Sequence, residues 1–383
     1  MNRICMFAEK LPPEFTGSGK QAIFLSRALQ QKGLSVIGLC SSSSGKYFKG
    51  DVDGVEIAYI GSSRNERMRS IQFAFSAIFW LVRNKKLYDI LHVHGYCVAA
   101  LPALIVAKIL SKKAIYKITL TGEDDPKALK NSRCGLVKES LLKYFDAMIA
   151  ISERVLETVS EFQYPVDKVY LIPNGVEDRF KPDNNLSAQC RNDLCDRLGI
   201  ERTRPIVLYI GSIEYRKGID VLAKAWINVQ ENMSNACLVL VGPYNEHEPF
   251  YGWFAELLKD AIGKSVFLTG KVKDTLNYYL ASDIFVFPSR NESFGNVLLE
   301  AMACGNACVA TNIEGVTENI INNGSDGIIV EQENDQELAE AIIQLLTNSS
   351  MRKMLSSNAV KTVDSKFRMK IIADKYIDLY QKL

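Results

Sequence analysis

The sequence lacks the spaced cysteine pairs and the histidine clusters from which disulfide frameworks and metal sites are built. Its nine cysteines stand singly along 383 residues, no two of them form a Cys-x-x-Cys pair, and only three histidines are present. An odd number of cysteines, several of them in apolar runs, is typical of buried thiols in a reducing compartment. We therefore expect no disulfides, no required metal ion and a cytoplasmic location.

Long apolar runs are also missing. The longest, residues 71–82 and 96–107, are well short of the ~20 residues that a membrane-spanning helix needs. At the start of the sequence, residues 3–8 have a strand pattern that Glu9 and Lys10 interrupt, which differs from a signal peptide. The sequence therefore predicts no membrane span and no signal peptide.

Basic residues surround the run at 71–82 on both sides: Arg64, Arg67, Arg69, Arg83, Lys85 and Lys86. A helix of this layout can lie on an anionic bilayer, or it can pack on a sheet inside a globular domain. Residues 1–183 carry 26 Lys and Arg against 19 Asp and Glu, whereas residues 184–383 carry 20 against 25. The basic first half favours an anionic partner such as a membrane surface, unless it reflects ordinary variation between halves.

Strand and helix patterns alternate in both halves of the chain. The expected strands are residues 3–8, 34–39, 57–60, 90–93, 114–120 and 147–151, then 206–210, 238–241, 265–268, 283–287 and 307–310; helices are expected at 20–31 and 218–230. Strands joined by crossover helices form parallel, doubly wound sheets. The predicted fold class is α/β, with two Rossmann-like domains that face one another across a cleft and bind ligands at the C-terminal ends of their strands.

A polar stretch from Lys181 to Arg204 separates the two halves. We expect an N-terminal domain at residues 1–182, a C-terminal domain at 183–365 and a terminal helical segment at 366–383. Apolar residues recur at helical spacing within 367–383. This periodicity predicts a helix with an apolar face and does not say where that face packs.

The most informative segment is residues 290–305, which follows an apolar strand pattern. It places Glu292 and Glu300 eight positions apart around a Phe294-Gly295 turn. A strand, a polar turn and a helix present a helix N-terminus to an anionic ligand. On one straight helix the two carboxylates would be ~12 Å apart. We therefore expect Glu292 in the turn and Glu300 in the helix, both facing one ligand, although two ordinary surface acids are the alternative.

Two glycine-containing loops have the composition of phosphate-binding segments. Gly17 and Gly19 open a helix after the first strand, and glycine lets backbone N–H groups approach a phosphate closely. Residues 211–218 follow a strand and end in Arg216-Lys217-Gly218. Fixed cations there can stabilise charge on a leaving group, although exposed basic pairs are common on any surface.

Polar residues also end two strands of the first half. His92 and His94 alternate along one strand, and Glu123, Asp124 and Asp125 follow the next. Isolated histidines are more often structural than functional. At the ends of parallel strands, however, they can contact a bound molecule.

Together these segments resemble glycosyltransferase family 4, and the resemblance covers nearly the whole chain with its motifs in the expected order. Residues 292–300 are similar to the Glu-x7-Glu signature, 211–218 to the Gly-Arg-x4-Lys-Gly loop, and 89–94 to the Asp-hydrophobic-hydrophobic-His-x-His element. The resemblance implies the GT-B fold, with the last helix crossing back to the first domain. It also implies a retaining transfer of a hexose from a nucleoside diphosphate sugar, UDP rather than GDP, to a hydroxyl of a glycan or lipid-linked acceptor.

The resemblance also assigns roles to residues. Glu300 is expected to bind ribose hydroxyls, Glu292 the donor sugar, and the N–H groups around Gly295 the phosphates. The expected catalytic residues are Glu292, Lys217, Arg216, Asp124 and His94. The expected donor-binding residues are Gly17, Gly19, Gly211, Ser212, Arg216, Lys217, Gly242, Lys271, Val272, Glu292, Phe294, Gly295, Asn296, Val297 and Glu300.

Several positions depart from the family pattern. Thr121 stands where the family commonly has a His near the reacting sugar, and Ser212 replaces the usual Arg of the glycine loop. Glu314 and Thr317 alter a Gly-Gly-x-Pro-Glu element, to which we assign a structural or peripheral role. The Glu-Asp-Asp run at 123–125 resembles the metal-binding Asp-x-Asp of the other glycosyltransferase fold, but the two-domain pattern argues against that fold.

Two other functions are open from the sequence. One is a nucleotide-sugar 2-epimerase of the same fold, which needs no acceptor. The other is a non-catalytic nucleotide-sugar-binding homologue, which the substitutions at Thr121 and Ser212 favour. The expected partners are the donor, the acceptor and, peripherally, an anionic membrane at its inner face, with no nucleic acid. The implied setting is bacterial surface polysaccharide biosynthesis, such as capsule or lipopolysaccharide.

Overall fold

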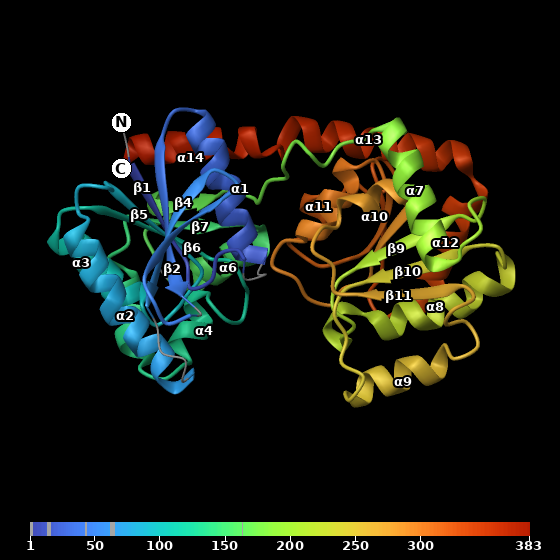
Figure 1. Ribbon diagram of the computed structural model, residues 1–383, viewed down its shortest axis with the longest axis horizontal. Helices are drawn as coiled ribbons and strands as arrows, with labels where there is room; N and C mark the ends of the chain where they lie inside the picture. Colours follow the sequence, from blue (N-terminus) through green and yellow to red (C-terminus); the bar gives the residue numbers. More distant parts are fainter. Residues whose placement is uncertain (1–2, 14–16, 43, 62–65, 163) are drawn as a thin grey trace. The chain divides into compact units, whose positions relative to one another are not determined.

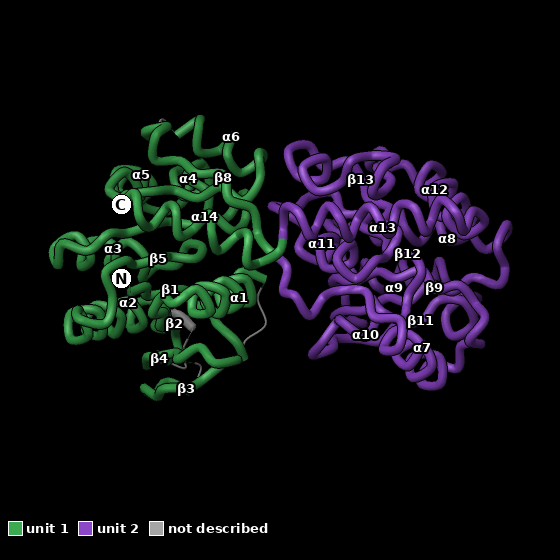
Figure 2. The backbone as a smooth tube through the Cα atoms, turned by 90° about the horizontal axis from the view of Figure 1, so that it is seen from above, with its two compact units in different colours: residues 1–175, 368–383 green, residues 176–367 purple. Residues whose placement is uncertain are grey.

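The chain forms two compact α/β units, shown in Figure 1 by a computed structural model that describes residues 3–13, 17–42, 44–61, 66–162 and 164–383. Unit 1 comprises Met1–Gly175 and Arg368–Leu383, and unit 2 comprises Val176–Phe367 (Figure 2). Each unit is built on its own sheet, so the predicted fold class, with two doubly wound domains, is confirmed.

Unit 1 contains an eight-stranded sheet in the order β3-β4-β2-β1-β5-β6-β7-β8. Its strands are β1 Arg3–Phe7, β2 Ser35–Ser42, β3 Phe48–Val52, β4 Val55–Gly61, β5 Ile90–His94, β6 Lys113–Lys117, β7 Ala147–Ala150 and β8 Val169–Leu171. All neighbouring strands are parallel except β3 and β4. The antiparallel edge strand β3 was not predicted, because most of its residues are exposed and it has no buried alternating pattern.

The helices of unit 1 are α1 Gly17–Gln31, α2 Glu66–Arg83, α3 Ala100–Ile109, α4 Pro126–Lys130, α5 Gly135–Leu142, α6 Glu153–Glu161 and α14 Met369–Lys382, with a 3-10 turn at Val166–Lys168. The last helix, α14, buries Ile372, Tyr376 and Leu379 in a core that it shares with α1 and the sheet. The predicted return of the C-terminal helix to the first unit is therefore confirmed. No helix among the described residues is long and apolar enough to cross a membrane.

Unit 2 contains a six-stranded sheet in the order β11-β10-β9-β12-β13-β14, with all neighbours parallel. Its strands are β9 Ile206–Ile210, β10 Cys237–Val241, β11 Val266–Gly270, β12 Ile284–Phe287, β13 Ala307–Thr311 and β14 Ile328–Val330. Its helices are α7 Asn184–Leu198, α8 Ile219–Asn232, α9 Pro249–Leu257, α10 Leu276–Ala281, α11 Asn296–Ala303, α12 Asp335–Thr347 and α13 Ser349–Lys366, with 3-10 turns at Tyr215–Lys217 and Thr317–Asn319.

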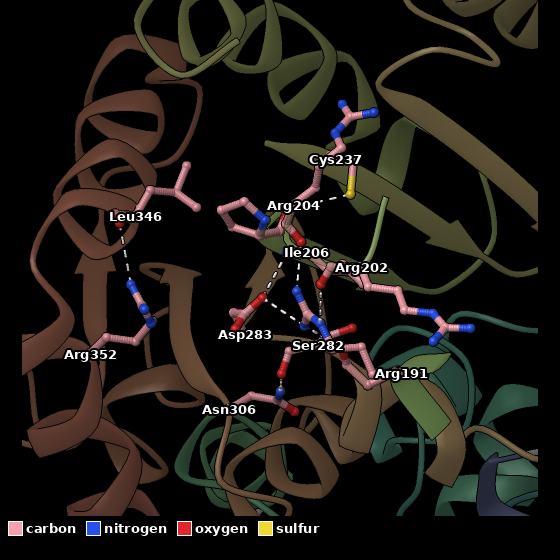
Figure 3. A network of polar contacts seen from close by, with 12 residues as sticks. Arg191, Arg202, Arg204, Ile206, Cys237, Ser282, Asp283, Asn306, Leu346 and Arg352 are labelled. Carbon is pink, nitrogen blue, oxygen red and sulfur yellow. Dashed lines mark hydrogen bonds and ion pairs between the residues drawn. The ribbon is translucent and has the colours of Figure 1, made fainter. Parts of the chain in front are cut away.

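Polar contacts tie β9 and β12 together at their amino ends (Figure 3). Arg191 of α7 donates to Asp283 Oδ2 at 3.1 Å, and the same oxygen accepts from the Ile206 amide at 2.8 Å. The guanidinium also donates to the Arg204 carbonyl at 2.6 Å. Because Ile206 begins β9 and Asp283 precedes β12, these bonds fix the two strands whose opposite ends carry the candidate site.

Candidate functional site

The carboxyl edge of the unit 2 sheet brings together most of the segments predicted to bind a donor. The loops that follow β10, β9 and β12 begin at Gly242, Gly211 and Pro288, on three neighbouring strands. From β9 the chain first adds β10 and β11 on one side of β9, and then adds β12, β13 and β14 on the other side of β9. Open α/β sheets bind ligands at such a change of direction.

Lys217 and Glu292 meet at this edge. The Lys217 ammonium donates to Glu292 Oε1, and Ser289 Oγ donates to the same oxygen at 3.2 Å. The Lys217 and Glu292 side chains are 17% and 14% exposed, and Arg216 Nη1 lies 4.0 Å from Glu292 Oε2. A lysine ammonium has three donors, so Lys217 can hold Glu292 and still bind an anion.

Backbone contacts explain why these two residues meet. Gly218 has φ 66°, and a Cβ at this position would lie 1.8 Å from the Pro288 carbonyl oxygen. Only glycine permits this approach between the β9 and β12 loops. The Arg290 amide then donates to the Arg216 carbonyl at 3.0 Å, and Arg216 Nη1 donates to the Asn291 carbonyl at 3.1 Å.

Arg290 is a second organiser of these loops, and the sequence motif did not indicate its role. Its guanidinium binds both Asp220 oxygens, at 2.6 and 2.7 Å, and also pairs with Glu333. It stacks over the Tyr215 ring, 3.8 Å from the centroid. The hydrogen bonds that Arg290 donates to Asp220 are the largest influence that raises the pKa of Arg290, so this residue is a permanent cation that ties the 3-10 turn to the β12 loop.

Glu300 lies inside α11 and Glu292 in the preceding loop, as expected. Glu300 Oε2 accepts from the Tyr279 hydroxyl at 2.9 Å. Gly295 precedes the helix with φ 104°, and no side chain caps the helix start. The first N–H groups of a helix receive no hydrogen-bond partner from the helix itself, and in α11 these belong to Asn296 and Val297 at this edge.

The remaining donor-side candidates follow the neighbouring strands. Gly242 has φ 151°, and a Cβ there would lie 1.9 Å from the Gly211 carbonyl oxygen. Tyr209 donates to the Ser212 carbonyl at 2.8 Å, which holds the start of the β9 loop. Lys271 and Val272 follow β11, and Val272 lines a separate hollow of about 260 Å³ against α7.

In unit 1, Gly17 and Gly19 lie in the first turn of α1, where Gly17 is exposed and Gly19 is buried. Both of these candidates therefore belong to a different unit from Lys217 and Glu292. The preceding Glu14 and Thr16 lie outside the described residues.

A hollow of about 320 Å³ opens at the carboxyl edge of the unit 1 sheet, where the chain order changes direction between β1 and β5. Its lining includes Glu9, Lys10, Ser18, His94, Tyr96, Thr119, Glu123 and Asp124. The His94 ring is 4% exposed, and neither of its nitrogens has a hydrogen-bond partner among the described residues. Burial is the main cause that lowers the pKa of His94, so a neutral imidazole faces this hollow.

Asp124 shapes the loop beside His94. Its carboxylate accepts from the Thr119 hydroxyl at 2.6 Å and from the amides of Thr119 and Leu120 at 3.0 and 2.8 Å. Burial raises the pKa of Asp124 to about 6, in opposition to these hydrogen bonds. Three donors occupy most of its acceptor capacity, so the bonds organise the loop before any bound molecule contacts Asp124.

Lys117 and His92 form a buried group behind the hollow that was not predicted to be functional. The Lys117 side chain is 2% exposed and lies 5.5 Å from the Tyr376 ring centroid. Burial lowers the pKa of Lys117 to about 7. His92 Nδ1 is 2.8 Å from the Tyr380 hydroxyl. The sequence feature that could have indicated this buried group is Lys117 itself, a lysine within the apolar strand pattern at 114–120.

Within the described ranges, no three His, Cys, Asp or Glu side chains come together as metal ligands would.

Two family models match the chain. Glycosyltransferase Family 4 matches residues 15–180, and Glycosyl transferases group 1 matches residues 191–362. The chain is 27% identical over 308 residues to N-acetyl-alpha-D-glucosaminyl L-malate synthase of Bacillus anthracis, with 78% of this chain and 76% of that protein covered. It is 29% identical over 209 residues to the capsular polysaccharide biosynthesis glycosyltransferase CapM of Staphylococcus aureus, with 54% and 52% covered.

A solved structure has the same fold. The crystal structure of Anabaena Alr3699/HepE in complex with UDP and glucose superposes with a TM-score of 0.78 at 17% identity and covers all of both chains.

Proposed function

Since the chain belongs to glycosyltransferase family 4 and has the GT-B fold, we propose that it transfers a hexose from a nucleoside diphosphate sugar to a hydroxyl of a glycan or a lipid-linked acceptor. The proposed donor is a UDP-sugar in preference to a GDP-sugar, and the proposed stereochemistry is retention. The Lys217–Glu292 pair beside the start of α11 is the observation that carries the proposal.

The donor side of the proposal assigns one task to each group at the unit 2 edge. Arg216 and Lys217 bind the diphosphate, together with the backbone N–H groups at the start of α11. Glu292 accepts hydrogen bonds from hydroxyls of the donor sugar, and Glu300 accepts hydrogen bonds from ribose hydroxyls. Lys217 also holds Glu292 in place, which links phosphate binding to sugar binding.

The chemical step needs charge stabilisation on the leaving group. As the glycosidic bond breaks, the nucleoside diphosphate gains negative charge, and preorganised cations stabilise it more in the transition state than in the ground state. Glu292 is not assigned as an in-line nucleophile by analogy with glycosidases, whose two carboxylates flank the scissile bond at set separations. The proposed reaction takes place on one face of the sugar, with an oxocarbenium-like transition state stabilised by the departing phosphate.

The acceptor side of the proposal uses the hollow in unit 1. His94 offers a neutral ring with unpartnered nitrogens, and Glu123 and Asp124 line the same hollow. A neutral imidazole can accept a hydrogen bond from an acceptor hydroxyl and orient it. With Thr121 in place of the usual His, we assign acceptor orientation to His94.

The wider setting of the proposal is surface polysaccharide assembly on the cytoplasmic side of a membrane. The similarity to CapM supports a polysaccharide product, and nine cysteines without a disulfide among the described residues support a reducing compartment. The proposal includes peripheral contact with an anionic membrane, because the basic excess lies in residues 1–183.

The test is calorimetric titration with UDP and with GDP in metal-free buffer, on the parent protein and on Glu300→Gln. We expect saturable binding of UDP, weakened about 10- to 100-fold in Glu300→Gln because a charged hydrogen-bond acceptor is lost. Glu231→Gln, at an exposed position of α8, is the matched control and should bind as the parent does. Absence of binding to both nucleotides would reject the proposed donor site.

A second measurement separates transfer from the other functions. A radiolabelled UDP-sugar is incubated with and without a mixture of membrane lipids and glycans. Acceptor-dependent incorporation of label supports transfer, whereas conversion of the sugar without an acceptor would identify an epimerase.

A further inference from the structure

Helix α2 carries apolar side chains on two sides. Its inner side includes Phe73, Ala77 and Leu81, each at most 1% exposed, and the Phe73 ring stacks on Phe7 with centroids 5.6 Å apart. A surface helix of a globular protein usually pairs one apolar face with a polar opposite face. The outer side of α2 departs from that rule, and core packing does not account for it.

The outer side presents a row of large apolar side chains, which we define as the α2 stripe: Met68, Ile71, Phe75, Phe79 and Val82. Spacings of three and four residues place them on one face of a helix. They are between 47% and 69% exposed, and no charged residue occurs between Arg69 and Arg83. A helix of 18 residues is ~27 Å long, so the stripe extends along most of the helix.

A hollow of about 550 Å³ adjoins the stripe. It is lined by Phe75, Phe79 and Trp80 of α2 together with Tyr47 and Ile60, at the edge where β4 ends. Of the described residues that line it, only Arg83 is charged. An apolar hollow with one cation suits a hydrocarbon chain whose head group is anionic.

Basic residues stand at both ends of the stripe. Arg69 lies near its start, and Arg83, Lys85 and Lys86 follow its end. These last three side chains are exposed, and none of them forms an ion pair with another residue that the structure describes. A basic residue near an anionic lipid surface contributes about fivefold to binding.

Exposed apolar side chains are concentrated in unit 1. Of 21 exposed large hydrophobic residues in the described part of the chain, 16 belong to unit 1 and five to unit 2. Helix α3 adds Ile105 and Ile109, which are 44% and 75% exposed, and α2 and α3 lie side by side in Figure 1. Within this excess, seven of the 16 exposed residues of unit 1 lie on α2 and α3.

From these observations we propose that the α2 stripe docks on an anionic phospholipid bilayer, with its cationic ends on lipid phosphates. The inference extends the membrane contact proposed above and rests on that part of the proposed function. A second copy of the chain fits less well, because either direction of pairing brings basic ends together. The stripe also offers on the order of 300 Å², well below the ~800 Å² per partner of a stable interface.

The test is co-sedimentation of the full chain with vesicles, in the absence of a nucleotide sugar so that its outcome is separate from glycosyl transfer. The vesicles contain phosphatidylcholine alone or with about one-third phosphatidylglycerol. We expect binding to the anionic vesicles at least about 10-fold stronger than to the neutral ones. Replacing Arg83, Lys85 and Lys86 by Gln should weaken binding about 100-fold, from the loss of three cations.

The apolar contribution is tested with Phe75→Ser/Phe79→Ser, whose parent side chains are 69% and 68% exposed, so the fold should be retained with an unchanged Tm. This variant should lose at least about 10-fold in binding. The matched control is Ile227→Ser/Trp253→Ser in unit 2, which should bind as the parent does. The proposal is overturned if the parent does not bind anionic vesicles, or if the unit 2 control loses as much vesicle binding as the α2 variant. It is also overturned if ultracentrifugation shows a dimer that Phe75→Ser/Phe79→Ser dissociates while vesicle binding is unaffected.

Discussion

The Lys217 ammonium binds the carboxylate of Glu292 although the two residues are 75 positions apart in the chain. Their contact joins the loop after β9 to the loop after β12, the two strands at which the unit 2 sheet changes direction. A cation for phosphate and a carboxylate for sugar hydroxyls are thereby set side by side before any donor binds.

Replacing either member of this pair should lower turnover strongly. We expect Lys217→Ala to reduce kcat about 100- to 1,000-fold, the range measured when one preorganised transition-state donor is removed, and Glu292→Ala to reduce it strongly as well. Steady-state kinetics on both variants checks this, with Lys224→Ala at an exposed position of α8 as the control. Both folds should remain intact by circular dichroism, and near-normal turnover in both variants would refute the assignment.

Gly218→Ala should destabilise unit 2. The new Cβ would meet the Pro288 carbonyl oxygen at 1.8 Å, at a residue with φ 66°, and strain of this kind costs of order 1–3 kcal/mol or more. Gly252→Ala is the contrasting control, because Gly252 lies inside α9 with open space at its Cβ position. That change should stabilise by about 0.5–1 kcal/mol. Urea denaturation of both variants gives the comparison, and equal midpoints would contradict the close approach of the two loops.

Asp124→Asn should change how stability depends on pH. Burial raises the pKa of Asp124 to about 6 from 3.8, so the folded state holds a proton that the unfolded state releases. The stabilisation from this proton is complete below the unfolded pKa and is lost as pH rises through the folded value. As pH rises from 4 to 6, the free energy of unfolding of the parent should therefore fall relative to that of Asp124→Asn. Denaturation midpoints of both proteins at pH 4.5 and 7 test this. An equal change of midpoint in the parent and in Asp124→Asn would contradict the raised pKa of Asp124.

Lys117→Met should stabilise unit 1 at neutral pH. Burial lowers the pKa of Lys117 to about 7 from 10.5, so the unfolded state binds the proton more tightly and parental stability falls as pH decreases from 10.5 towards 7. The gain from Lys117→Met should be larger at pH 7 than at pH 10. Lys113→Met, at the exposed start of β6, is the control and should show no such trend. Thermal melts across this range measure the difference.

Removal of divalent metals should leave activity unchanged. In the proposed site the positive charge near the diphosphate comes from Arg216, Lys217 and the start of α11, which no chelator removes. Initial rates in EDTA and in excess magnesium should agree within about twofold, whereas one divalent ion at a diphosphate would contribute several kcal/mol. Loss of turnover in EDTA, restored by added metal, would show that the donor site also needs a metal ion.

Much of the fold followed from local patterns. The predicted strand at 206–210 coincides with β9, and the helix expected in 367–383 is α14. The strand expected at 114–120 ends early, at Lys117, because the amides of Thr119 and Leu120 bind the Asp124 carboxylate. Strands β8 and β14 have only three residues each and were missed, since so short a segment carries no detectable period.

The positions of site residues were predictable where the residues belong to one contiguous sequence motif. The turn and helix that hold Glu292 and Glu300 are contiguous in sequence, so their arrangement could be expected. The pairing of Arg290 with Asp220 joins residues 70 positions apart, and no local pattern encodes it. The burial of Lys117 depends on α14, at the opposite end of the chain.

The position of α14 also affects the order in which the two units can finish folding while the chain is being synthesised. Residues Arg368–Leu383 belong to unit 1, and Ile372, Tyr376 and Leu379 are almost fully buried in its core. A ribosome adds about 5–20 residues per second, so roughly ten to forty seconds separate the synthesis of Gly175 from that of Arg368. During that interval the nascent unit 1 exposes the apolar core residues that α14 later covers, while unit 2, continuous from Val176 to Phe367, can fold first. The unit that begins first is therefore completed last.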